Sequence, residues 1–193
     1  MAKKKLAGYR AKRDLRRSGE PSGATRRADG EGPVFVIQKH AASSLHYDFR
    51  VEIDGVLASW AVPKGPSTDP RVKRLAIEVE DHPLDYGGFE GTIGKGLYGA
   101  GSVIVWDTGS YENLGEEPVA EARERGHLSL WLHGQKLRGG YTLQRTGGGG
   151  KPQWLLIKRR DKEADARRNP VSTEPQSVLS GRTVEQVAAE AES

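Results

Sequence analysis

Short β-type runs separated by turn residues fill the middle of this chain, and this alternation constrains the fold more than any other feature. Asp54-Gly55 between two of the runs is typical of a tight hairpin, and Gly139-Gly140 marks a later turn. Because no long helical period separates the runs, the pattern favours a mainly β fold, a small antiparallel barrel or sandwich. The runs are FVIQKH, HYDFRVEID, GVLASWAV, RLAIEVE, SVIVWD, HLSLWLHG, YTLQRT and QWLLIKRR.

Polar segments flank this middle zone. Residues 1–32 carry ten Lys or Arg residues against four Asp or Glu residues, a composition typical of a solvated, disordered tail. Residues 161–193 have no aromatic residue and only a thin apolar stripe over 183–192. We therefore predict a basic N-terminal arm over 1–32 and a β domain over 33–160. A polar tail, largely disordered or a short helix, is expected over 161–193.

Composition excludes several classes of site. The chain contains no cysteine, so disulfides and thiolate-bound zinc are excluded, and a metal site must use His, carboxylate and water. The start MAKKKLAGYR lacks the apolar region of a signal peptide, and no run approaches the ~20 apolar residues of a membrane span. The net charge of +4 is compatible with a polyanionic partner. We expect a soluble protein that works inside the cell.

The run HYDFR brings together side chains that suit a metal and a phosphate. Side chains alternate along a strand, so His46, Asp48 and Arg50 share one face while the intervening residues can fill a core. Gln38 and His40 share a face in the preceding run. If the two runs are neighbours, two imidazoles and a carboxylate converge as a facial ligand set for Mn²⁺, Fe²⁺, Co²⁺ or Zn²⁺. Arg50 would offer paired hydrogen bonds to a bound phosphate. A strand with one wet face is the simpler alternative.

The segment EDHPLDY adds candidates beyond the fourth run. A protonated His82 could bind a phosphate oxygen or donate a proton, and Tyr86 could hydrogen-bond the same anion. The alternative is a turn at His82 with Tyr86 packed on the β domain. Lys64 and Arg74 are further candidate phosphate contacts, although a single basic residue is more often a surface charge.

The glycine-rich segment GGFEGTIGKGLYGAG does not fit the known phosphate loops. Its glycine spacing differs from that of the Walker A motif, and it lacks the strand and helix that flank a dinucleotide-binding fingerprint. Glycines allow the backbone to adopt positive φ. We interpret the segment as a tightly turning connection with a structural role.

Together these segments resemble the 3′-phosphoesterase family, which occurs as a domain of bacterial DNA ligase D and as stand-alone proteins. The resemblance extends from about Arg13 to Asp161, with a weaker stretch over LWLHGQKLRGGYTLQR and WLLIKRRD. Gly94 stands where the family pattern has proline, which affects local rigidity. The matching text is FVIQKHAASSLHYDFRVEIDGVLASWAVPKGP, RLAIEVEDHPLDYGGFEG and YGAGSVIVWDTGSY.

The resemblance implies a β-barrel enzyme that uses Mn²⁺, with Co²⁺ or another divalent metal as alternatives. Such an enzyme resects a 3′-terminal ribonucleotide by removing a nucleoside and then the remaining 3′-phosphate. The resemblance makes His40, His46 and Asp48 the metal ligands. The catalytic residues it implies are Arg50, His82, Tyr86, Asp14 and Glu20, and the phosphate or substrate contacts are Arg13, Gln38, Arg50, Lys64, Arg74 and His82. The second half of the arm would then fold over the site.

The same resemblance implies partners and a location. The expected substrate is a DNA or RNA-ended primer–template, and the expected process is non-homologous end joining in a prokaryotic cytoplasm, near the nucleoid. The sequence shows no ligase or polymerase domain, so DNA ligase, polymerase and Ku would act in trans on a monomer.

Two other functions fit parts of the sequence. HxD followed by a distant His also describes non-haem Fe(II) oxygenases, with His46 and Asp48 joined by His127 or His133. A non-catalytic nucleic-acid-binding module, with the basic arm on phosphates, is the other alternative.

Overall fold

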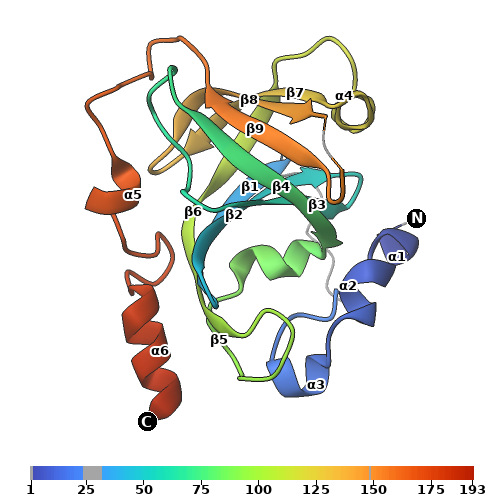
Figure 1. Cartoon of the computed structure of the whole chain (residues 1–193), viewed down its shortest axis with the longest axis vertical. Coiled ribbons are helices and arrows are strands. Elements are labelled where there is room, and N and C mark those ends of the chain that lie inside the picture. The colour runs from blue at the N-terminus through green and yellow to red at the C-terminus, as the bar shows by residue number, and fades with distance from the viewer. Residues whose placement is uncertain (1, 24–31, 148) are drawn as a thin grey trace.

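The computed structural model describes residues 2–23, 32–147 and 149–193, and the described part is mainly β (Figure 1). Its strands form one antiparallel sheet in the order β1-β2-β3-β4-β9-β8-β7-β6-β5. The strands are β1 (Val34–Ala41), β2 (Leu45–Ile53), β3 (Val56–Val62), β4 (Lys73–His82), β5 (Gly91–Ile93), β6 (Gly101–Asn113), β7 (His127–Gly134), β8 (Arg138–Thr146) and β9 (Gln153–Lys158).

The sheet closes on itself because β1 pairs with β2 along one edge and with β6 along the other. Eight strands therefore form a closed barrel, and β5 adds to the free edge of β6 near its start. Closure leaves the wall strands without exposed edges. The predicted antiparallel β-barrel is confirmed, and the sandwich alternative is excluded.

Alternate residues of each wall strand face the barrel interior. Along β2 the aromatic rings of Tyr47 and Phe49 belong to the buried core, together with Trp60 of β3 and Trp106 of β6. The residues between them, including Asp48, point to the outer face of the wall, as the side-chain alternation of a strand requires. The apolar face of HYDFRVEID thus closes the core while its polar face stays available for chemistry.

Short helices and loops cover part of the outer wall. Figure 1 shows the N-terminal helices beside the end of β4, and the η1 turn below β1 to β3. α2 packs on β4 and η1 packs on β3, so the outer face of these strands is enclosed rather than solvated. The helical elements are α1 (Ala2–Lys5), α2 (Ala7–Ala11), α3 (Leu15–Ser18), η1 (Leu84–Gly88), α4 (Val119–Arg125), α5 (Pro170–Thr173) and α6 (Val184–Glu192).

The arm and the tail both contact the barrel. Leu6 and Tyr9 of the arm are buried. Residues 24–31, which include part of the predicted basic run, lie outside the described residues. At the other end, α6 begins with a capping box between Thr183 and Gln186, and Val184 packs in a small cluster with Ile104. Among the helices of the described ranges, none has the length and apolarity to cross a membrane.

Candidate active site

Three potential metal ligands converge on the outer wall where β1 meets β2. The register pairs His40 directly with His46, and Asp48 follows two residues along β2 on the same face. One ligand atom from each residue lies within 4.8 Å of the other two. His40 Nδ1 is 3.7 Å and His46 Nε2 is 3.4 Å from the same oxygen, Oδ2 of Asp48. The three side chains can therefore hold a divalent metal ion.

Backbone carbonyls fix which nitrogen each imidazole offers. His40 Nε2 lies 2.8 Å from the carbonyl oxygen of Gly99, and His46 Nδ1 lies 3.2 Å from that of Ser44. A carbonyl only accepts, so these nitrogens carry protons, and the opposite nitrogens point toward Asp48, where a bound cation would meet their lone pairs. Such outer contacts orient histidines that ligate metals. The donor set and its support therefore fit a divalent cation.

Arg50 is held rigidly beside the three ligands. Its Nε donates to Gln38 Oε1 at 2.7 Å, and one terminal nitrogen donates to Ser59 Oγ at 2.9 Å. The other terminal nitrogen is 3.4 Å from Asp48 Oδ2. Burial acts to raise the pKa of Asp48, but Arg50 and the two histidines together hold it well below its usual range. Asp48 is therefore ionised, as a metal ligand must be.

A β-bulge brings His82 to this site. Ser59 of β3 pairs with Val79 of β4, and Leu57 of β3 pairs with His82 of β4. Two steps along β3 therefore correspond to three steps along β4. The extra residue in β4 shifts its side-chain alternation by one position. His82 therefore faces the same side as Val79, and both line the pocket with Arg50.

His82 is neutral in this arrangement. Its Nδ1 donates to the carbonyl oxygen of Glu80 at 2.9 Å, and its Nε2 accepts from Arg13 at 3.2 Å. Burial, and then the positive charges of Arg50 and Arg13, lower the pKa of His82 well below its ordinary value. A protonated His82, which the sequence suggested, is not the form favoured here.

This neutral histidine should make the protein sensitive to acid. As pH falls below about 6.5, the unfolded chain binds a proton at this position and the folded chain does not. The free energy of unfolding should therefore fall by up to about 1.4 kcal/mol per pH unit through this residue. Urea unfolding with EDTA at pH 7.5 and 5.5 should show a smaller pH difference for His82→Gln than for the unmodified protein. The exposed His127→Gln variant is the control, and equal pH differences in all three proteins would contradict the expectation.

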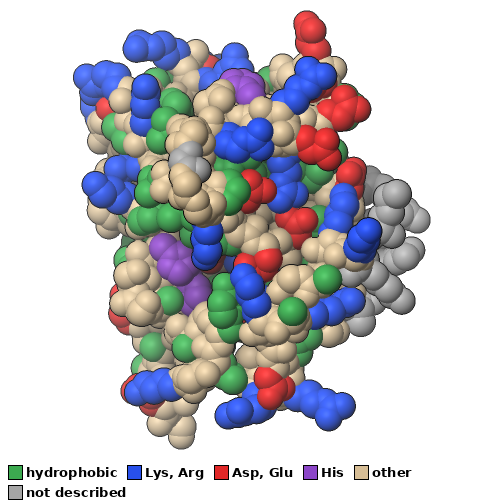
Figure 2. Space-filling view, turned by 45° about the vertical axis from the view of Figure 1, so that its right-hand side comes forward, with side chains coloured by type: hydrophobic (Ala, Val, Ile, Leu, Met, Phe, Trp, Pro, Cys, Tyr) green, Lys and Arg blue, Asp and Glu red, His purple; other side chains and the backbone are tan. Residues whose placement is uncertain are grey.

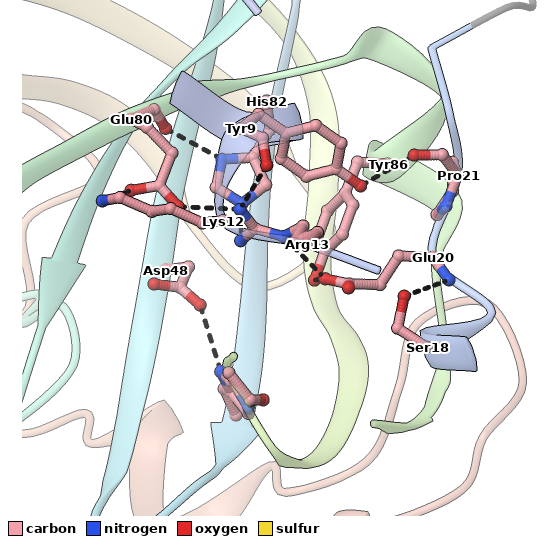
Figure 3. A network of polar contacts seen from close by, with 12 residues as sticks. Tyr9, Lys12, Arg13, Ser18, Glu20, Pro21, Asp48, Glu80, His82 and Tyr86 are labelled. Carbon is pink, nitrogen blue, oxygen red and sulfur yellow. Dashed lines mark hydrogen bonds and ion pairs between the residues drawn. The ribbon is translucent and has the colours of Figure 1, made fainter. Parts of the chain in front are cut away.

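The arm closes over the site through Arg13, which lies between two carboxylates (Figure 3). Arg13 Nε donates to Glu20 Oε1 at 3.0 Å, and a terminal nitrogen donates to Glu80 Oε1 at 2.9 Å. The Arg13 side chain is only 5% exposed. Tyr86, whose pKa burial raises above its ordinary value, donates to Glu20 Oε1 at 3.3 Å. The second oxygen of Glu20 is buried and has no hydrogen-bond partner.

The pocket beneath the arm is a cavity of about 150 Å³ that gathers most of the predicted site residues. Figure 2 shows histidine side chains exposed on the face of the molecule turned toward the viewer, with a Lys or Arg side chain beside them. The predicted residues that line the pocket are Arg13, Glu20, His40, His46, Asp48, Arg50, His82 and Tyr86. Gln38 supports the pocket from behind, since its amide donates to the carbonyl oxygens of Tyr86 and Phe89.

Besides Gln38, three predicted residues lie apart from the pocket lining. Asp14 is exposed and begins α3, and Lys64 is exposed in the turn after β3. Arg74 shares the face of β4 that carries the core residue Ala76, and its Nε is buried without a partner. The ligand set of the oxygenase alternative, with His127 or His133 joining His46 and Asp48, is not formed, because His40 completes the one potential metal-binding group within the described ranges. His133 pairs with Glu112 on β6, 2.7 Å away.

Several pocket residues were not predicted from the sequence. Glu80 binds both Arg13 and Lys12, and its position two residues before His82 was the available signal. Tyr98 lines the pocket from the glycine-rich segment, which the sequence indicated only as a structural connection. Tyr9 lies outside the lining, and its ring packs 5.0 Å from that of His82.

Known proteins share much of this sequence. The DNA Ligase D 3′-phosphoesterase domain family matches residues 38–145. The chain is 55% identical over 185 residues to the multifunctional non-homologous end joining protein LigD of Pseudomonas aeruginosa, covering 94% of this chain and 22% of that protein. It is 46% identical over 151 residues to the multifunctional non-homologous end joining DNA repair protein LigD of Mycobacterium tuberculosis, covering 78% and 19%. The chain therefore spans about a fifth of the length of these curated relatives.

Proposed function

Because this chain belongs to the DNA ligase D 3′-phosphoesterase domain family, we propose that it is a metal-dependent enzyme that heals the 3′ ends of nucleic acids. It removes a 3′-terminal ribonucleoside and then the remaining 3′-phosphate, leaving a 3′-hydroxyl. The observation that carries the proposal is the convergence of His40, His46 and Asp48 next to the fixed guanidinium of Arg50. This arrangement supports chemistry on a phosphoester.

His40, His46 and Asp48 would hold the metal, which we assign as Mn²⁺, with Co²⁺ as the alternative. Mixed nitrogen and oxygen donors suit these ions better than Ca²⁺. When bound, the cation supplies positive charge to the phosphate oxygens as the phosphorus gains a fifth ligand. The carbonyl contacts of both imidazoles support this assignment because they keep the ligand nitrogens aimed at one point.

Arg50 and His82 would contact the scissile phosphate. Arg50 is already oriented by Gln38 and Ser59, so it can stabilise developing negative charge with little reorganisation. His82 begins neutral, with Nε2 accepting from Arg13. It can therefore take up a proton, or accept a hydrogen bond, before it donates one. A bound phosphate would favour its protonated form by adding negative charge.

The remaining residues would act on the substrate around this centre. Glu20 has a buried carboxylate oxygen without a partner, and Tyr86 has its hydroxyl at the pocket wall. Both groups are suited to hydrogen-bond a terminal ribose or phosphate. Arg13 positions Glu20 and Glu80. We assign Asp14 to catalysis, and Gln38, Lys64 and Arg74 to the neighbouring phosphates, on the family resemblance.

The biological setting is also a proposal. The matched relatives are named as non-homologous end joining proteins, and we propose that this chain acts in that process on DNA or RNA-ended primer–templates. DNA ligase, polymerase and Ku would act with it, in the bacterial cytoplasm at the nucleoid. We retain the division into an arm over 1–32, a barrel over 33–160 and a tail over 161–193, with the end of the arm completing the site.

The decisive experiment follows a 5′-labelled primer–template that ends in one 3′-ribonucleotide, incubated with Mn²⁺, with Co²⁺, or with EDTA. We expect stepwise conversion to a 3′-phosphate and then to a 3′-hydroxyl with either metal, and no conversion with EDTA. Retention of the substrate under every metal condition, together with tight, salt-sensitive binding of the primer–template, would instead support the non-catalytic binding module.

A further inference from the structure

The pocket has an apolar side that the proposed chemistry does not use. Ala42, Ile93 and Tyr98 contribute to its lining beside the acidic and basic residues. Ile93 is buried, but Tyr98 is 45% exposed, one of the few large hydrophobic side chains of the described residues that remain open to solvent. An exposed ring at the edge of a phosphate-binding pocket is a candidate contact for the part of the substrate that is not phosphate.

The backbone fixes this ring next to the metal ligands. Tyr98 lies in the turn between β5 and β6, where the amide of Leu97 donates to the carbonyl of Gly94 at 3.2 Å. Gly96 and Gly99 adopt φ of 82° and 75°, which glycine tolerates and other residues rarely do. The carbonyl of Gly99 orients His40. The glycine-rich segment thus holds Tyr98 one residue from a contact of the proposed metal site.

Two cations lie against the Tyr98 ring. Lys12 Nζ is 5.3 Å and the guanidinium carbon of Arg13 is 5.0 Å from the ring centroid. The ring remains nearly half exposed beside them. Aromatic rings combined with basic side chains are how proteins bind unpaired nucleotides, because bases stack on the ring while cations neutralise the backbone.

We propose that Tyr98 forms a stacking subsite for the base of the 3′-terminal nucleoside, the group released in the first of the two reactions. This inference rests on the proposed function and adds to it a second contact, away from the phosphate. Every base has a π face, so the subsite should accept any of the four bases. It should act on ends that carry a nucleoside and have no role for ends that carry only a phosphate.

A purely structural role predicts a different pattern. If Tyr98 only anchors the arm through Lys12 and Arg13, its removal would disturb the pocket for every substrate. The 3′-phosphate end is therefore the internal control, because it uses the same metal, Arg50 and His82 but has no nucleoside, and so no base, beyond the scissile phosphate.

The test compares Tyr98→Ala and Tyr98→Phe on primers that end in a ribonucleotide and on the same primers ending in a 3′-phosphate. For Tyr98→Ala we expect KM for the ribonucleotide end to rise by about 5- to 100-fold with kcat little changed. Activity on the 3′-phosphate end should stay within about twofold, and Tyr98→Phe should resemble the unmodified protein, since the stacking surface is kept.

A terminal ribose without a base makes the test sharper. For the unmodified protein, KM should rise on this baseless end by about the same factor as it rises for Tyr98→Ala on the complete nucleotide. For Tyr98→Ala, removing the base should raise KM little further. Equal losses of Tyr98→Ala on ribonucleotide and phosphate ends, or no loss on either, would overturn the subsite. Inactivity of the unmodified protein on both ends would instead overturn the proposed function itself.

Discussion

Replacing His46 with alanine should lower the rates of both proposed reactions by more than about a hundredfold. Removing only an outer contact of a metal ligand typically costs 10- to 100-fold, so the loss of a ligand should exceed that range. The His46 side chain is 22% exposed and lies on the outer wall, away from the barrel core. The variant should therefore keep its fold, and the loss should reflect the site alone.

His133→Ala is the matched control, because it removes another surface histidine from a barrel strand, one that pairs with Glu112 instead of Asp48. Calorimetric titration with Mn²⁺ should show binding to the unmodified protein and to His133→Ala, and at least tenfold weaker binding to His46→Ala. Undiminished Mn²⁺ affinity and turnover in His46→Ala would refute the assignment of the three ligands.

The second large effect is expected for Arg13→Ala. Arg13 is nearly fully buried between Glu20 and Glu80, and removing it leaves the buried Glu20 without its cation and Glu80 with Lys12 alone. Breaking a buried ion pair in this way typically costs about 3–5 kcal/mol. Because Arg13 joins the arm to the outer wall and takes no part in the barrel core, we expect the arm to detach rather than the barrel to unfold. Activity should fall with it, since Glu20 leaves the pocket.

Hydrogen exchange can localise this effect. The amides of Arg10 and Ser18, which donate to backbone carbonyls within the arm, should exchange faster in Arg13→Ala, while amides of the barrel strands should not. Arg16→Ala removes an exposed arginine from the same arm and should change neither the exchange nor the activity. Arg13→Lys keeps the charge but not the planar fork, so it should recover only part of the docking. Protected arm amides in Arg13→Ala would show that other contacts hold the arm.

The β-barrel and the convergence of the three potential metal ligands could be predicted from the sequence because both depend on local alternation. In HYDFRVEID the period of two separates Tyr47 and Phe49 from Asp48 and Arg50, and the structure places the first pair in the core and the second on the outer wall. The pairing of His40 with His46 required only that the two runs be neighbours, which a short connection between them favours.

The part of the site formed by the end of β4 and the N-terminal arm could not be predicted in the same way. Glu80 and His82 reach the pocket through a bulge in β4, and a bulge leaves no periodic signal in the sequence. In the arm, Tyr9 packs on His82 and Arg13 binds Glu80, and these partners lie 73 and 67 positions further along the chain. A contact between such distant segments depends on tertiary packing that composition does not report. For this reason a basic, polar stretch resembled a solvated tail.

The two faces of β2 also tie catalysis to correct strand pairing. The same nine residues supply two aromatic rings to the interior, and an imidazole, a carboxylate and a guanidinium to the outer wall. A slip of one residue against β1 would exchange the two sets and separate His40 from His46. Partly active, misaligned molecules are therefore not expected. In a refolding experiment, the recovered specific activity would count the fraction of chains whose barrel closed in the native register.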